Sequence, residues 1–257
     1  MSTKLAMKRS GAPSSCPLVL IHALPLDSSM WDQVRENLQE VDIITVDAPG
    51  FGESPAGENF SETPSIPAYA SAIKAVLDDA GVTQIKIGGL SMGGAVAAEF
   101  VAQYPEMIAG LALMDTGIGA DDEGKRAFRE NMADMAENGQ AYEAVANWTT
   151  TMVSPNVTAE VQTSLDQRFR KIPGDALAWI QRAMANRLDR TDAVELVDGP
   201  VYFVRGSDDV TCSLEYLMNL ALRAERPRIV EIENAGHFSA DEQPAALAKI
   251  LAEFVSA

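Results

Sequence analysis

Ser91, His237 and the adjacent pair Asp208 and Asp209 have the side chains needed for nucleophilic catalysis. A serine hydroxyl is a poor nucleophile unless a base takes its proton, and histidine is the usual base near neutral pH. The imidazole in turn needs a carboxylate that fixes its tautomer and stabilises its positive charge. These residue types follow one another in the order Ser, Asp, His, so the sequence predicts a serine nucleophile that is activated by a histidine and a carboxylate.

The residues around Ser91 predict a tight turn from a strand into a helix. The segment reads QIKIGGLSMGG, apolar and strand-like before the serine, and a helical pattern follows as far as Tyr104. Gly89 and Gly93 have no Cβ atom, so the strand and the helix can approach closely around the turn. We expect the turn to hold the Ser91 hydroxyl clear of the backbone, with the helix N-terminus favouring developing negative charge.

Apolar runs that alternate with helical patterns predict an α/β fold with a mostly parallel central sheet and helices on both faces. The residues before the first of these runs leave room for at most one further strand. Because ligand chemistry gathers at the carboxyl ends of parallel strands, we expect the candidate residues to meet at one edge of the sheet. The predicted strands are residues 17–21, 41–50, 84–90, 109–115, 199–206 and 228–234.

Residues 117–198 interrupt this alternation, because they show helical patterns alone. We expect a helical cap, or lid, inserted after the strand that ends near Asp115, in a core domain made of residues 1–116 and 199–257. The cap has large apolar side chains that are candidates for contacts with a substrate: Trp148, Met152, Trp179 and Met184. The alternative is that they pack the helices of the cap against one another, as such residues at helical spacing usually do.

Two helix starts are predicted from capping residues. Ser28 or Ser29 is expected to cap the first helix of the chain. Ser239, with Glu242 three residues later and Pro244 in the first turn, predicts a capping box at the start of the last helix.

Taken together, the motifs resemble the α/β-hydrolase family over nearly the whole chain. The resemblance lies in LVLIHALPLDSSMW, VDAPGFGES, GGLSMGG, the Gly-x-x-Asp pattern of GSDD, and AGHF. It implies that Ser91 is the nucleophile, His237 the base and Asp209 the acid, since Asp209 is the third residue after Gly206.

The resemblance also implies an oxyanion hole made of two backbone N–H groups. One belongs to Met92, directly after the nucleophile, and the other to Leu24, in the loop after His22. Ala23 stands where the family usually has glycine, which puts the geometry of the Leu24 donor in question. His22 is expected to brace this turn and not to act as a second base.

Other carboxylates leave alternatives open. Asp115 ends a predicted strand, where some relatives place their acid, so it competes with Asp209 for that role. Asp208 is expected to be a solvated or loop-bonding neighbour of the acid. Asp47, at the end of the second predicted strand, is expected to accept hydrogen bonds from turn amides.

Composition narrows the class of protein. The chain has 257 residues and a net charge of −17, which disfavours nucleic acid and anionic membrane surfaces as partners and suits a cytoplasmic protein. Cys16 and Cys212 are far apart and the chain has two histidines, so a zinc site is not expected and the cysteines are expected to be free thiols. We expect no metal and no organic cofactor.

The expected activity is that of a serine hydrolase acting on a small carboxylic ester or lactone, most similar to small-molecule esterases and enol-lactonases. Carbon–carbon bond hydrolysis or thioester cleavage on the same triad is the first alternative. A small-molecule receptor of the same fold is an alternative of another class, and a purely structural protein would not need three catalytic side chains. Dehalogenases and epoxide hydrolases carry aspartate at the nucleophile position, so Ser91 argues against both.

Overall fold

The computed structural model describes residues 4–257, and a seven-stranded sheet forms their centre. The strand order is β1-β3-β2-β4-β5-β6-β7, with β1 antiparallel to β3 and the other neighbours parallel. The mostly parallel sheet predicted from the sequence is therefore confirmed. One short strand, β1, is added at the edge of the sheet beside β3. The strands are β1 (Met7–Ser10), β2 (Leu18–Ile21), β3 (Ile43–Val46), β4 (Ile85–Leu90), β5 (Ile108–Met114), β6 (Pro200–Gly206) and β7 (Arg226–Ile232).

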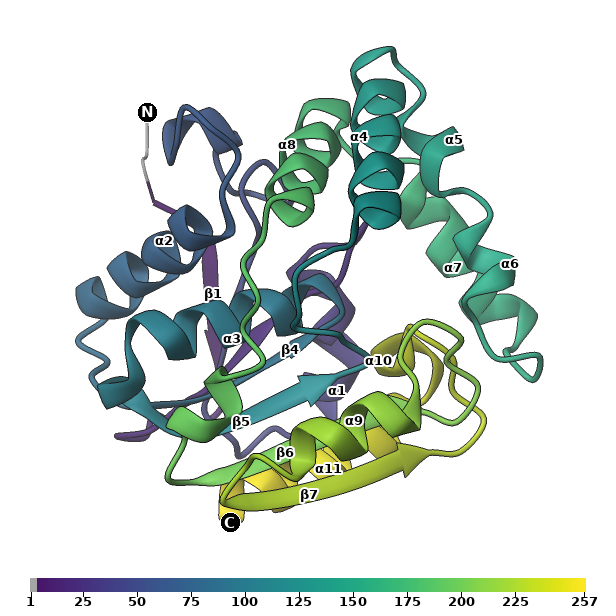
Figure 1. Ribbon diagram of the computed structural model, residues 1–257. Coiled ribbons are helices and arrows are strands. Elements are labelled where there is room, and N and C mark those ends of the chain that lie inside the picture. The colour runs from purple at the N-terminus through teal and green to yellow at the C-terminus, as the bar shows by residue number, and fades with distance from the viewer. Residues whose placement is uncertain (1–3) are drawn as a thin grey trace.

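Helices cover both faces of the sheet (Figure 1). On the face towards the viewer lie α2 (Ile66–Asp79), α3 (Met92–Gln103) and α9 (Leu214–Ala221), and on the far face α1 (Asp32–Glu36) and α11 (Pro244–Ser256). Short helices connect them: η1 (Ser28–Trp31), η2 (Gly57–Asn59), η3 (Pro105–Met107) and α10 (Ser239–Glu242).

Burial of α3 distinguishes it from the other helices of the sheet. Its residues Met92 to Val101 are all buried, which is typical of a helix enclosed by the core on every side. Glu99 is among them, and both of its carboxylate oxygens accept hydrogen bonds from Arg190, at 2.7 and 3.0 Å. This bidentate ion pair compensates the buried charge and ties residue 190 to the helix that follows Ser91.

Residues 117–198, between β5 and β6, form helices and contain no strand. Figure 1 shows α4 and α8 packed side by side above α3, with α5, α6 and α7 beside them. The helices of this segment are α4 (Glu123–Glu137), α5 (Ala141–Val145), α6 (Trp148–Thr151), α7 (Ala159–Phe169), α8 (Gly174–Ala185) and η4 (Ala193–Leu196).

Helices begin at Ser28 and at Ser239 as predicted, but the predicted capping residues are wrong. Asp27, and not a serine, accepts the capping hydrogen bond at the start of η1, from the Ser29 N–H. The Ser239 hydroxyl donates to the buried Asp115 carboxylate and caps nothing, and the last helix is divided at Gln243 into α10 and α11. Glu242 does reach back to a helix-start amide, the N–H of Phe238. The capping-box prediction was wrong because a buried carboxylate competes for the serine hydroxyl.

Candidate active site

The turn between β4 and α3 holds Ser91 in a strained conformation. Its φ of 56° and ψ of −116° lie where residues other than glycine are rarely found. The Ser91 N–H donates to the Met114 carbonyl at 2.9 Å, and the Ser91 carbonyl accepts from the Thr116 hydroxyl at 2.6 Å. The end of β5 thus fixes the backbone on both sides of the serine.

Glycines on each side of the turn allow α3 to approach the sheet at backbone distance. A Cβ atom at Gly89 would lie 2.1 Å from the carbonyl carbon and oxygen of Gly93. A Cβ atom at Gly93 would lie 2.2 Å from the Ile21 carbonyl oxygen. Neither position has space for a side chain, as the sequence predicts.

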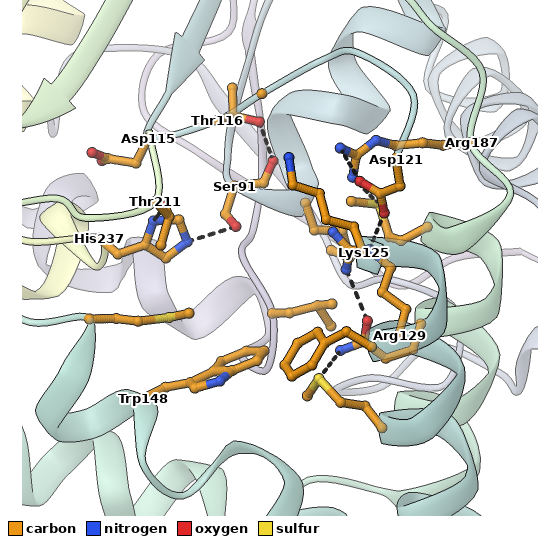
Figure 2. A pocket seen from close by; sticks show the side chains of 18 residues that line it. Ser91, Asp115, Thr116, Asp121, Lys125, Arg129, Trp148, Arg187, Thr211 and His237 are labelled. Carbon is orange, nitrogen blue, oxygen red and sulfur yellow. Dashed lines mark hydrogen bonds and ion pairs between the residues drawn. The ribbon is translucent and has the colours of Figure 1, made fainter. Parts of the chain in front are cut away.

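Ser91, His237 and Asp209 are brought together at the carboxyl ends of β4, β7 and β6. The Ser91 Oγ lies 2.8 Å from His237 Nε2, and His237 Nδ1 lies 3.2 Å from an Asp209 oxygen. Both His237 and Asp209 are buried. Figure 2 shows Ser91, His237 and Thr211 converging at one end of a cavity.

Thr211 is a fourth member of this group that the sequence analysis missed. Its hydroxyl donates to Asp209 at 2.8 Å and lies 2.8 Å from His237 Nδ1, so it can accept from the ring while it donates to the acid. The Thr211 N–H donates to the same Asp209 oxygen at 2.7 Å. The position two residues after the acid was the available signal, since side chains at that spacing often close local turns.

The pKa values of the two buried aspartates, Asp209 and Asp115, are shifted in opposite directions. Burial alone would raise the pKa of Asp209, but hydrogen bonding to His237, its charge, and the Thr211 donors hold that pKa below its usual value. Burial, and then the charge of Asp209, raise the pKa of Asp115 well above its usual value. Asp209 is therefore the carboxylate that stays ionised beside the imidazole.

Asp115 is occupied elsewhere. Its oxygens accept from the Gly206 N–H at 2.6 Å and from the Ser239 hydroxyl at 2.5 Å. These contacts join the ends of β5 and β6 to the start of α10. The geometry gives Asp115 a bracing position beneath the acid loop, whereas Asp209 faces the histidine.

The loop that carries His237 is fastened to the segment between β5 and β6. The His237 N–H donates to the Met152 carbonyl at 2.7 Å, and a Cβ atom at Gly236 would lie 2.4 Å from the same oxygen. One Glu242 oxygen accepts from the N–H groups of Gly236, at 2.9 Å, and Ser154, at 2.7 Å. Burial raises the pKa of Glu242 although these donors act against it.

Asp208 also contributes to this junction, as the partner of the Ser154 hydroxyl at 2.6 Å. The expectation of a loop-bonding neighbour describes it well. Asp47 likewise accepts from turn amides, those of Ser28 at 2.8 Å and Glu53 at 3.0 Å.

His22 braces the loop that contains Leu24. Its Nε2 accepts from the Ala48 N–H at 2.9 Å, which leaves Nδ1 to donate to the Ala23 carbonyl at 3.0 Å. Burial lowers the pKa of His22, so the ring is neutral and this tautomer is fixed. Leu24 and Met92 both line the cavity beside Ser91, and no hydrogen-bond acceptor is found for their N–H groups within residues 4–257.

The cavity has a volume of about 380 Å³ and lies between Ser91 and the helices α4, α6 and α8. Trp148, Met152 and Met184, three of the four predicted apolar contacts, line it. Trp179 lies elsewhere: a Cβ atom at Gly57 would be 2.4 Å from its ring, so the indole packs on η2. Helical spacing could not tell these two environments apart.

Charged residues of the cavity were missed by the sequence analysis. Lys125 and Arg129 on α4 line it together with Phe128 and Met132, and Arg187 follows α8. The spacing of the four α4 residues, at i, i+3, i+4 and i+7, was a signal that they share one helix face. For Arg187 we find no such signal.

Other reactive groups stay outside this chemistry. Burial raises the pKa of Cys212 to about 12, so its thiol is protonated. Across residues 4–257 there is no cluster of His, Cys, Asp and Glu that could hold a metal ion. No helix within this range is both long enough and apolar enough to cross a membrane.

A sequence profile described as the alpha/beta hydrolase family matches residues 18–250. The chain belongs to this family. The seven-stranded, mostly parallel sheet with helices on both faces is consistent with this membership.

Individual relatives match almost the full length of this chain. A putative 2-succinyl-6-hydroxy-2,4-cyclohexadiene-1-carboxylate synthase of Bacillus subtilis is 27% identical over 98% of this chain and 95% of its own. An esterase from Thermogutta terrifontis, solved with malate bound, has a TM-score of 0.91 at 28% identity, covering 98% of this chain and 93% of its own. An enol-lactonase from Burkholderia xenovorans shares the fold, with a TM-score of 0.84 at 20% identity over 98% and 96%.

Replacing Gly93 with alanine tests the close approach of α3. Because the new Cβ would meet the backbone of β2, we expect Gly93→Ala to lower the free energy of unfolding by at least about 2 kcal/mol, measured by urea denaturation. Gly124→Ala is the matched control, since its Cβ would meet nothing nearer than 3.4 Å in the first turn of α4. Equal effects of the two substitutions would contradict the packing argument.

The raised pKa of Asp115 predicts how its substitution depends on pH. A carboxyl group whose folded-state pKa is raised stabilises the fold below its unfolded pKa, and this contribution is lost as pH rises through the folded value. Asparagine cannot ionise, so Asp115→Asn should gain stability relative to the parent protein between about pH 5 and about pH 8.

Free energies of unfolding at both pH values measure the Asp115→Asn effect. Asp198→Asn, at an exposed site, controls for the loss of one negative charge. A difference between Asp115→Asn and parent that stays constant with pH would show that Asp115 is already ionised in the folded protein.

Proposed function

We propose that this alpha/beta hydrolase is a serine hydrolase that cleaves a small carboxylic ester or lactone on a triad of Ser91, His237 and Asp209. The observation that carries the proposal is the 2.8 Å contact between Ser91 Oγ and His237 Nε2, on a strained turn and with His237 Nδ1 facing Asp209. The cavity of about 380 Å³ supports a small substrate, since it lies at the lower end of the range for ligand sites.

The chemistry follows from this geometry. His237 takes the hydroxyl proton while Ser91 Oγ attacks the carbonyl carbon, and the N–H groups of Leu24 and Met92 stabilise the oxyanion. When the intermediate collapses, His237 gives the proton to the departing alkoxide and an acyl-serine ester remains. Water then attacks this ester with His237 again as base, which releases the acid and restores the Ser91 hydroxyl.

Residues 117–198 act in this proposal as a cap on a core of residues 1–116 and 199–257. Trp148, Met152 and Met184 supply the apolar contacts with the substrate. A cap that excludes bulk water strengthens the hydrogen bonds to the oxyanion.

A second candidate is a reaction other than ester or lactone hydrolysis on the same triad, such as carbon–carbon bond hydrolysis or thioester cleavage. The relative from Bacillus subtilis, which matches this chain almost end to end, bears the name of a synthase. A panel of nitrophenyl esters, lactones, thioesters and diketone acids separates these reactions, since ester or lactone turnover alone fits the first candidate.

The roles of the triad are tested by three substitutions. Ser91→Ala should lower kcat by about 10³-fold or more in a folded protein, and Asp209→Asn should be far more damaging than Asp208→Asn, because an amide cannot stabilise the imidazolium. Activity is measured on the ester and lactone panel, and labelling of Ser91 by a fluorophosphonate provides a readout free of substrate choice. Near-normal turnover of folded Ser91→Ala would end the serine-hydrolase proposal, and labelling without turnover would favour a receptor.

Thr211 is a positioning residue in this mechanism, because it acts on the reaction through His237 and Asp209. Thr211→Val removes the hydroxyl shared by acid and base, so kcat should fall about ten-fold with KM little changed. Thr211→Ser keeps the hydroxyl and should restore most of kcat. If valine and serine behave alike, the hydroxyl has no part in orienting the imidazole.

A further inference from the structure

The cavity beside Ser91 has a charge opposite to that of the whole chain. The cations Lys125, Arg129 and Arg187 line it, against the carboxylates of Asp115 and Asp121 among the described residues. The chain as a whole has a net charge of −17. Beyond a Debye length of about 8 Å the surrounding negative charges are largely screened, so a bound ligand experiences the local excess of positive charge.

Asp121 is already shared between the two arginines. Its fully buried side chain forms ion pairs with Arg129 and, at 2.8 Å, with Arg187. Arg129 also donates to Gln181 on α8 at 2.9 Å, and Arg187 to the Gly119 carbonyl at 2.8 Å. One carboxylate between two guanidinium groups leaves a positive charge in place.

Asp115 adds little to the compensation. It faces Gly206 and Ser239 at the strand ends, and its raised pKa favours the neutral form. Burial, and then the charge of Arg129, lower the pKa of Arg187, although the charge of Asp121 acts against them.

Unlike the two arginines, the Lys125 ammonium group forms no close ion pair with another described residue of the cavity. Its ion-pair partner is Asp122 at 3.8 Å, beyond hydrogen-bond distance, and both side chains are about two-thirds exposed, at 69% and 67%. Figure 2 shows the Lys125 side chain reaching from α4 into the space between Ser91 and the ion pairs of Asp121. A largely exposed ammonium group on a four-carbon stem can bind an anion at this place at little cost to the fold.

We propose that the cavity selects substrates that carry a carboxylate apart from the scissile carbonyl, and that Lys125 binds this carboxylate beside the Arg129–Asp121–Arg187 ion pairs. The proposal rests on the proposed function, since it names the substrate class of the same site. Lys125 is a specificity residue here, while the two arginines hold the shape of the cavity and supply its positive potential.

Matched esters test the preference for charge. Monomethyl succinate is compared with methyl 4-methylpentanoate, in which an isopropyl group replaces the carboxylate on the acyl side. The pair 4-carboxyphenyl acetate and 4-isopropylphenyl acetate makes the same comparison on the alcohol side. In at least one pair, kcat/KM should be higher for the anionic ester, and this preference should weaken with added salt.

Substitutions of Lys125 assign the preference to a residue. Lys125→Met should reduce the ratio of anionic to neutral kcat/KM by about ten-fold, and Lys125→Arg should retain most of it. Lys249→Met, at an exposed position of α11 on the far face of the sheet, controls for the loss of one positive charge and should leave the ratio unchanged. Parent protein that hydrolyses both members of each pair equally well would overturn the proposal while the hydrolase function stands.

Binding to an inactive protein separates the two proposals. Calorimetry on Ser91→Ala should detect succinate, with an affinity that falls about ten-fold when Lys125→Met is added. Succinate binding of this kind in a protein that hydrolyses no ester would support the anion site and reject the ester hydrolase. If succinate neither binds nor is discriminated in ester form, the anion site is rejected.

Discussion

The backbone contact between α3 and the central strands is the constraint on which the rest of the site depends. Helix α3 begins directly after β4, and at Gly89 and Gly93 the backbones are too close for side chains. The turn between them therefore cannot relax to a less strained conformation. Ser91 takes up the resulting strain in its backbone, whose N–H and carbonyl are fixed by Met114 and Thr116 at the end of β5. The hydroxyl is thereby held where it meets His237. The histidine and the acid are therefore brought to a fixed point by two other strand ends.

Much of this arrangement could be predicted from the sequence because each residue is placed by the short segment of chain around it. Ser91, His237 and the pair Asp208 and Asp209 each follow a predicted strand, and parallel strands end at one edge of a sheet, so strand prediction placed them together. The choice of Asp209 within the pair came from the family resemblance. The predictions that were wrong, or that left an alternative open, depend on contacts distant in the chain. The sequence predicts Ser239 as a helix cap, but its hydroxyl donates to the buried Asp115. The sequence also gives Trp179 the same role as Trp148, but the Trp179 ring packs against Gly57.

Charge shows the same division between average and local properties. A net charge of −17 describes the surface of the chain but says nothing about one cavity lined by three cations. Lys125 and Arg129 share a helix face that the sequence reveals by spacing, whereas Arg187 and Asp121 join them through folding alone. Composition therefore describes the average charge that a partner of the exterior would meet, and it does not predict the ligand of the cavity.

The junction of Met152, Ser154 and Glu242 with the histidine loop limits how this protein can diversify. Gly236 accepts no side chain against the Met152 backbone, and the Glu242 carboxylate joins amides from both sides. The inserted segment also contacts the core elsewhere, as in the ion pair of Arg190 with Glu99, but this junction is the one that reaches the loop of His237. If the inserted helices were exchanged between relatives, residues 152–154 would therefore have to be exchanged together with Gly236 and Glu242, which contact them.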